Sequence, residues 1–119
     1  MDKLEEIVFI SPGEELYTTS EIVAVKSQVQ HHAIQQMLIK YEKDFQEFGV
    51  LAFEMRKPEN GRKGGRPAVI YHLNEQQSTL LMTFLKNTEP VRRFKKDLVR
   101  RFYAMRELLR ERQSTEWLI

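Results

Sequence analysis

Residues 49–73, GVLAFEMRKPENGRKGGRPAVIYHL, decide the expected fold, because two strand-like runs flank a basic, glycine-rich connection. Apolar side chains alternate along both runs: Leu51, Phe53 and Met55 in the first, and Val69, Tyr71 and Leu73 in the second. Three glycines between the runs permit positive φ, and Pro58 and Pro67 bracket the connection without donating to a strand ladder. The pattern predicts a β-hairpin with a long tip.

The expected tip is strongly basic. Residues 56–67 hold five cationic side chains and one acid, the cations being Arg56, Lys57, Arg62, Lys63 and Arg66. Such a tip can contact the phosphates of a DNA duplex or enter its minor groove. A solvated surface loop has a similar polarity. The tip alone therefore leaves both interpretations open.

Two helices are expected before the hairpin. Thr18 and Glu21 have capping-box spacing, and Tyr17 and Ile22 have that of a hydrophobic staple, so the first helix is predicted to start at Thr18 or one residue later. A tight turn is expected at residues 27–30. The second helix is indicated by apolar side chains at intervals of three and four residues: Ile34, Met37, Leu38, Tyr41, Phe45 and Phe48.

Two more helices are expected after the hairpin. Asn74 is placed to cap the first, whose predicted buried residues are Leu80, Leu81, Phe84 and Leu85. Pro90 opens the second, which runs to about residue 113 with an apolar stripe of Phe94, Leu98, Phe102, Met105 and Leu109. This stripe is expected to complete the protein's own core. The alternatives are a contact between two copies and a membrane surface.

Helix, turn, helix and a two-stranded wing follow one another in the order of a winged helix-turn-helix. We therefore expect an α+β fold in one domain spanning residues 1–119: a winged helix-turn-helix-like domain with a two-stranded β-hairpin wing and two C-terminal helices. Residues 1–15 are expected to form either an edge strand or a loose segment.

Charge is unevenly distributed along the chain. Residues 1–55 contain 4 basic and 10 acidic side chains, and residues 56–119 contain 15 and 7, so that halves of −6 and +8 give the net charge of +2. Concentrated positive potential favours a polyanionic partner. Nucleic acid is the commonest such partner, and an anionic membrane is the second.

Several functional classes find no support in the sequence. The chain has no cysteine, which excludes disulfides, thiolate metal sites and cysteine nucleophiles. His31 and His32 would point about 100° apart on a helix, which does not suit a shared metal. The chain has neither a P-loop ending nor a G-x-S-x-G motif. We therefore expect no enzyme, no metal and no cofactor.

The expected location is the cytoplasm. No apolar run reaches the ~18 residues that span a bilayer, and the acidic start, MDKLEE, does not resemble a secretory signal. We therefore expect a soluble protein with no membrane partner.

The start of the second helix is rich in side chains that can bond to base edges: Gln30, His31, His32, Gln35 and Gln36. The alternative is that they are ordinary solvent-facing residues. The last helix adds weaker candidates for backbone contacts, Lys95, Lys96, Arg100 and Arg101. The alternative for these is a helix that faces a partner subunit.

Ordered landmarks between residues 17 and 110 resemble those of a known family. The second half contributes YHLNEQQ at 71–77, LLMTFL at 80–85, NTE at 87–89, Phe94-Lys95 and FYAM at 102–105; the first half contributes TSEIVA at 19–24 and VQHHAI at 29–34. In the last of these, His31 best matches a family histidine. In their order and spacing the landmarks resemble the phage regulatory protein Rha family.

The resemblance implies a phage or prophage regulator that acts inside a bacterial host cell, in the decision between lysogeny and lytic growth. It leaves two mechanisms open. We expect binding to double-stranded DNA as a homodimer. The alternative is an antirepressor-type module that binds a repressor or other regulatory protein and needs no DNA.

Overall fold

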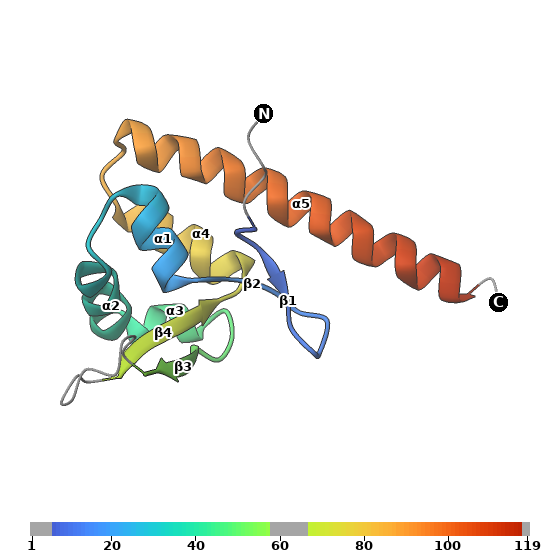
Figure 1. Ribbon diagram of the computed structural model, residues 1–119, viewed down its shortest axis with the longest axis horizontal. Coiled ribbons are helices and arrows are strands. Elements are labelled where there is room, and N and C mark those ends of the chain that lie inside the picture. The colour runs from blue at the N-terminus through green and yellow to red at the C-terminus, as the bar shows by residue number, and fades with distance from the viewer. Residues whose placement is uncertain (1–5, 58–66, 118–119) are drawn as a thin grey trace.

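The computed structural model describes residues 6–57 and 67–117, with side chains as far as residue 113. Within these residues, a four-stranded antiparallel sheet lies against five helices (Figure 1). The strands are β1 (Phe9–Ile10), β2 (Leu16–Thr19), β3 (Ala52–Arg56) and β4 (Ala68–Leu73). The helices are α1 (Ser20–Ser27), α2 (His31–Lys40), α3 (Glu42–Gln46), α4 (Glu75–Phe84) and α5 (Glu89–Trp117). The α+β class is confirmed.

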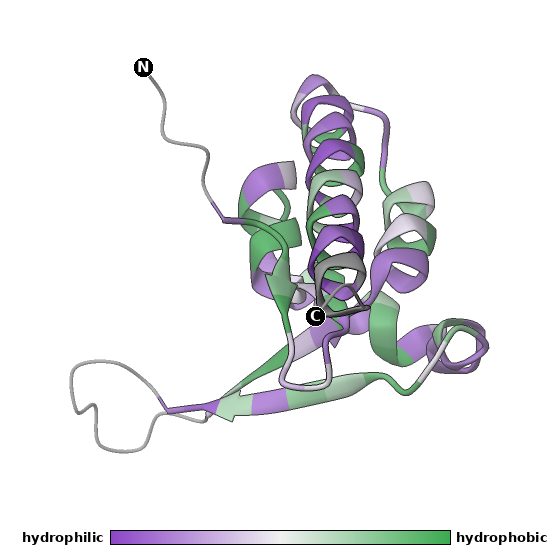
Figure 2. Cartoon of the chain, turned by 90° about the vertical axis from the view of Figure 1, so that its right-hand side faces the viewer, coloured by the Kyte–Doolittle hydropathy of each residue, from purple (hydrophilic) through white to green (hydrophobic). Residues whose placement is uncertain are grey.

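The sheet has the strand order β1-β2-β4-β3. β1 is an edge strand paired with β2, so the edge-strand alternative for the N-terminal segment is right where the structure describes it. β3 and β4 pair antiparallel as predicted, with Phe53 opposite Tyr71 and Met55 opposite Val69. The predicted hairpin tip, residues 58–66, lies outside the described residues. Figure 2 shows the β3–β4 ribbon extending to one side of the helices.

The first helix begins one residue later than its capping-box spacing indicates. Thr18 is buried in β2 opposite Leu73, so it does not cap a helix, and Tyr17 and Ile22 no longer have the staple spacing relative to the cap. Thr19 caps α1 instead, because its side chain accepts the Ile22 N–H. Sheet pairing thus takes precedence over the local capping signal.

The predicted turn between the first two helices is confirmed. Gln28 ends α1 in the left-handed conformation with φ 57°, and the Val29 N–H donates to the Ala24 carbonyl at 3.0 Å. This closes α1 as a glycine would, although no glycine is present. The chain then enters α2 after Gln30, which has an extended backbone.

The predicted second helix is in fact two helices. Tyr41, with φ −111° and ψ 29°, separates α2 from α3. Neither glycine nor proline marks this break, and the three- and four-residue spacing continues through it. The rings of Tyr41, at the break, and of Phe45, in α3, lie 5.0 and 5.7 Å from that of Phe84. Tertiary packing of these rings therefore accompanies a break that the local pattern does not indicate.

The core lies between the sheet and the helices, and all five helices contribute buried residues to it. The predicted stripe of α5 packs inward, since Phe94, Leu98, Phe102 and Leu109 are buried and Met105 is partly buried. On α4, Leu81 and Leu85 are buried as predicted and Leu80 is partly buried. The expectation that Phe84 is buried is wrong. This ring is 37% exposed, because it packs against α3 at the edge of the domain.

A buried glutamine holds the segment before β3 onto α4. Gln77 is 1% exposed, and its Nε2 donates to the carbonyls of Phe45 and Gly49 at 3.2 and 3.0 Å. Its Oε1 accepts the Asn74 N–H, and the Asn74 side chain caps α4 in return by accepting the Gln77 N–H. The predicted cap is therefore confirmed as a full capping box. One amide side chain thus links α3, the start of the hairpin and α4.

Replacing this amide by an apolar group of similar size should be costly. Gln77→Met leaves several buried backbone groups without partners, and we expect the free energy of unfolding to fall by about 2 kcal/mol or more. Chemical denaturation measures the loss. Gln76→Met is the matched control, because Gln76 is exposed on the same turn. Equal stability of the two variants would contradict the role assigned to Gln77.

Candidate nucleic-acid interface

The hydroxyl of Ser20 joins three elements at one point. Ser20 is the first residue of α1 and is fully buried. Its Oγ accepts the Tyr71 N–H of β4 at 2.9 Å and lies 2.9 Å from Nε2 of His31, the first residue of α2. A single side chain therefore sets the N-terminus of α2 against the returning strand of the hairpin.

A second hydrogen bond fixes α2 one turn further along. Gln35 Nε2 donates to the Val69 carbonyl of β4 at 2.8 Å. Because His31 and Gln35 are four residues apart, they lie on the same face of α2. That face is turned toward β4, so the two bonds together determine both the position and the rotation of α2 relative to the hairpin.

The environment of His31 favours its neutral form. Burial lowers the pKa of His31 below its ordinary value of 6.5; the Glu21 carboxylate opposes this effect, and the Arg56 guanidinium adds to it. The Ser20 oxygen already accepts an amide proton, so its own proton is free to be donated to an unprotonated Nε2. A protonated Nε2 would carry a hydrogen of its own and could not accept the Ser20 proton.

Arg56 ties the base of the hairpin to α1. Its Nη1 lies 2.8 Å from Glu21 Oε1, and its Nη2 lies 3.1 Å from Glu54 Oε1. The hydrogen bond to Glu21 is the main cause of a raised Arg56 pKa. All three side chains are almost half exposed, so a phosphate group can reach this guanidinium. Lys57 follows directly and is also exposed.

The predicted interface residues divide into three groups. Gln30, His32 and Gln36 are exposed, whereas His31 and Gln35 are half-buried and bonded to neighbouring elements. The hairpin-tip residues Arg62, Lys63 and Arg66 lie outside the described residues. Where it is described, the structure brings the start of α2 and the base of the hairpin together. Sequence reasoning missed Ser20 and Glu21 as the residues that connect these elements.

The cations of α5 are not part of this assembly. Lys96 and Arg100 are exposed and Arg101 is half-buried, and Arg100 lies 3.6 Å from Asp97 of its own helix. Within residues 6–57 and 67–113, no hydrogen bond or ion pair links these cations to α2 or to the hairpin. Lys95 instead lines a groove between α4 and α5.

Comparison with family models matches residues 18–107 to the family described as phage regulatory protein Rha. The chain belongs to this family. The match runs from β2 into α5, so it includes both α2 and the strands of the hairpin. It confirms the resemblance noted from the sequence landmarks. Comparisons with curated proteins and with solved structures found no match.

Two further properties of the Rha-family domain bear on its partners. No helix in the described part of the chain is both long enough and apolar enough to cross a membrane. The described residues also contain no group of three or more His, Cys, Asp or Glu side chains that could hold a metal ion. The surface made by α2 and the base of the hairpin places amide and imidazole groups beside the exposed cations Arg56 and Lys57.

Removing the Ser20 hydroxyl should destabilise the Rha-family domain. Ser20→Ala leaves the buried Tyr71 N–H without an acceptor, so we expect unfolding free energy to fall by about 1 to 3 kcal/mol. Ser27→Ala is the matched control, because Ser27 is also a buried serine of α1 but its hydroxyl has no hydrogen-bond partner among the described residues. Urea denaturation should show little or no loss for this control. Similar losses for both variants would contradict the argument.

The state of His31 should appear in the pH dependence of stability. Because its folded-state pKa lies below the unfolded value of 6.5, the unfolded chain binds the proton more readily. Stability is therefore lost as the pH falls below about 6.5. Melting curves between about pH 7.5 and 5.5 should show a smaller decrease for His31→Gln than for the native chain. His32→Gln, at the exposed neighbouring position, should behave as the native chain does; a full pH response in His31→Gln would refute this origin.

Proposed function

We propose that this phage regulator binds duplex DNA through α2 and the β3–β4 hairpin, as a winged helix-turn-helix protein does. The observation that carries the proposal is that α2 is linked to β4 at two points. Gln35 donates directly to the Val69 carbonyl, and Ser20 Oγ is bonded both to His31 and to the Tyr71 N–H. They hold a helix rich in amide and imidazole groups beside a basic hairpin. Reading base edges and contacting the backbone require such a fixed relation.

In this proposal, α1 and α2 form the helix-turn-helix and α2 is the recognition helix. The exposed side chains Gln30, His32 and Gln36 approach the bases in the major groove. His31 and Gln35 mainly set the position of α2, and they would offer a base their remaining polar atoms, Nδ1 and Oε1. β2 supports this arrangement by joining the segment before α1 to the returning strand of the wing.

The cations of the hairpin would contact the DNA backbone or enter a minor groove. They are Arg56 and Lys57 at its base, and Arg62, Lys63 and Arg66 in the segment outside the described residues. Arg56 has carboxylate partners in the free protein, but exposed pairs of this kind contribute at most about 1 kcal/mol each. A phosphate can therefore compete for the guanidinium.

We also propose that the protein acts as a symmetric dimer, since a twofold protein matches two half-sites of an operator. The cations Lys96, Arg100 and Arg101 of α5 are secondary candidates for backbone contacts. Lys95 is assigned below to the contact between the two copies.

An antirepressor-type role is the second candidate, and the edge of the sheet favours it. β3 is exposed along its whole length, and Phe53 and Met55 are 60% and 57% exposed. An apolar edge strand is a surface on which another protein can add a strand. In that case the protein would act by binding another regulator, without DNA.

Fluorescence anisotropy of a labelled random duplex across a salt series tests the DNA proposal. The native protein should bind with a steep salt dependence, because each phosphate contact releases about one counterion. Replacing Arg62, Lys63 and Arg66 by glutamine should weaken binding to all sequences and lower the slope by up to about three.

The matched control removes the same charge elsewhere. Lys43, Lys86 and Arg112 are exposed cations outside the proposed interface, and their replacement by glutamine should leave the slope nearly unchanged. An unaltered slope in the hairpin variant would contradict the role of the wing. No binding by the native protein at low salt would refute DNA recognition and favour the regulator-binding alternative.

A further inference from the structure

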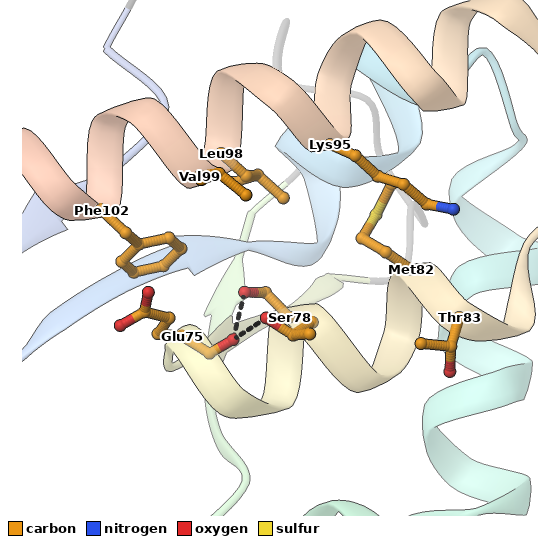
Figure 3. Close-up of a pocket in the computed structure, with 9 residues that line it drawn as sticks. Glu75, Ser78, Met82, Thr83, Lys95, Leu98, Val99 and Phe102 are labelled. Atoms are coloured by element: carbon orange, nitrogen blue, oxygen red, sulfur yellow. Dashed lines mark hydrogen bonds between the residues drawn. The ribbon is translucent and has the colours of Figure 1, made fainter.

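A groove runs between α4 and α5 on the surface of the domain (Figure 3). The two helices are antiparallel neighbours, because Glu75 at the start of α4 pairs with Arg106 far along α5. At the other end of the groove, Met82 and Thr83 of α4 lie near Lys95, close to the start of α5. The groove therefore lies along a helical hairpin.

The floor and walls of the groove are apolar. Met82, Leu98 and Phe102 are at most 5% exposed and form its floor. The hydroxyls of its wall are bonded within α4: those of Ser78 and Thr79 donate to the Glu75 carbonyl, and that of Thr83 donates to the Leu80 carbonyl. The wall consequently has little hydrogen-bonding capacity left, and an occupant is recognised mainly by apolar contact.

Exposed apolar side chains continue from the groove along α5. Val99, on its rim, is 69% exposed, and Tyr103, one turn further on, is 59% exposed. Figure 1 shows the C-terminal part of α5 extending past the rest of the domain. The exposure of Val99 and Tyr103 leaves this side of the helix accessible to a partner. The same helix thus offers both a ridge and one wall of a groove.

The two ends of the groove carry opposite charges. Lys95 lies at one end and has no acidic partner within the described residues, whereas Glu75 lies at the other end (Figure 3). A twofold axis across the groove exchanges its ends, so Lys95 of one copy would meet Glu75 of the other. Glu75 binds Arg106 through Oε1, and its second oxygen can accept another cation. The twofold arrangement would thus give Lys95 of each copy an acidic partner, beside the Glu75–Arg106 ion pair.

We infer that the α4–α5 groove is the contact between two copies of this chain, in which α4 and α5 of each copy form a four-helix bundle. Val99 and Tyr103 of one copy fill the groove of the other, and Lys95 pairs across the axis with Glu75. Such isologous contacts are the commonest basis of symmetric dimers. This inference rests on the dimer included in the proposed function and names its surface.

A second copy suits this groove better than a small molecule does. The volume of the groove, about 260 Å³, is below the roughly 300–1,000 Å³ of typical ligand sites. The location also agrees with the proposed DNA surface. α5 packs against α1, β2 and α4, whereas α2 packs against α1 and α3 and is bonded to β4. A bundle of α4 and α5 thus leaves the α2 surface of each copy uncovered.

Sedimentation equilibrium of the full chain without DNA tests the inference. The native protein should give twice the 14.2 kDa mass of one chain. Val99→Glu places a charge in the apolar contact and should raise the dimer dissociation constant at least about tenfold. Val25→Glu is the matched control, because Val25 of α1 is 68% exposed and lies outside the groove. Circular dichroism should show both variants folded, since both side chains are mainly exposed.

Cysteine cross-linking provides a second test, because the native chain has no cysteine. Val99→Cys should be joined into a dimer by a short bismaleimide, and Val25→Cys should not. A monomeric native protein, a Val99→Glu variant that dimerises normally, or equal cross-linking at both positions would each overturn the inference. None of these results depends on DNA binding, so failure of the dimer contact is distinguished from failure of the proposed function.

Discussion

The hydroxyl group of Ser20 is the contact on which the arrangement of the proposed DNA surface depends. It joins α1, the first residue of α2 and a backbone amide of β4, and the Ser20 side chain itself is fully buried. The bond from Gln35 to the Val69 carbonyl adds a second point of attachment. With two attachments, α2 cannot turn about its axis without breaking a buried hydrogen bond. The orientation of its outer face therefore depends on polar groups of its inner face.

The polar residues of α2 therefore belong to two groups, one on its inner face and one on its outer face. A row of glutamines and histidines at the start of a helix suggests that all of them meet the same partner. In the folded chain, two bind the framework and three are exposed. Arg56 has a similar double character, since it holds the hairpin to α1 and stays accessible. In the proposed function, structural and recognition roles are thus combined at adjoining positions of the domain.

The long last helix separates two surfaces of the domain. Its buried stripe completes the core against α1 and β2, and its outer side, together with α4, presents an apolar groove with oppositely charged ends. The groove is not evident from the sequence, because the basic side chains along α5 suggest contact with nucleic acid along the whole helix. The position of α5 on the domain instead favours the proposal that one segment of α5 contacts the second copy, while α2 contacts the partner that the regulator recognises.

The sequence by itself determined the hairpin pairing, the Asn74 cap and the inward stripe of α5, because these follow from local periodicity and capping chemistry. The sequence landmarks also indicated membership of the Rha family, which the match over residues 18–107 confirms. Tertiary structure decided the start of α1, the break at Tyr41 and the exposure of Phe84, since each depends on sheet pairing or ring packing between distant segments. It also decided which polar residues of α2 are exposed. The bond from Ser20 to Tyr71 spans 51 residues, and no local pattern specifies a partner at that separation.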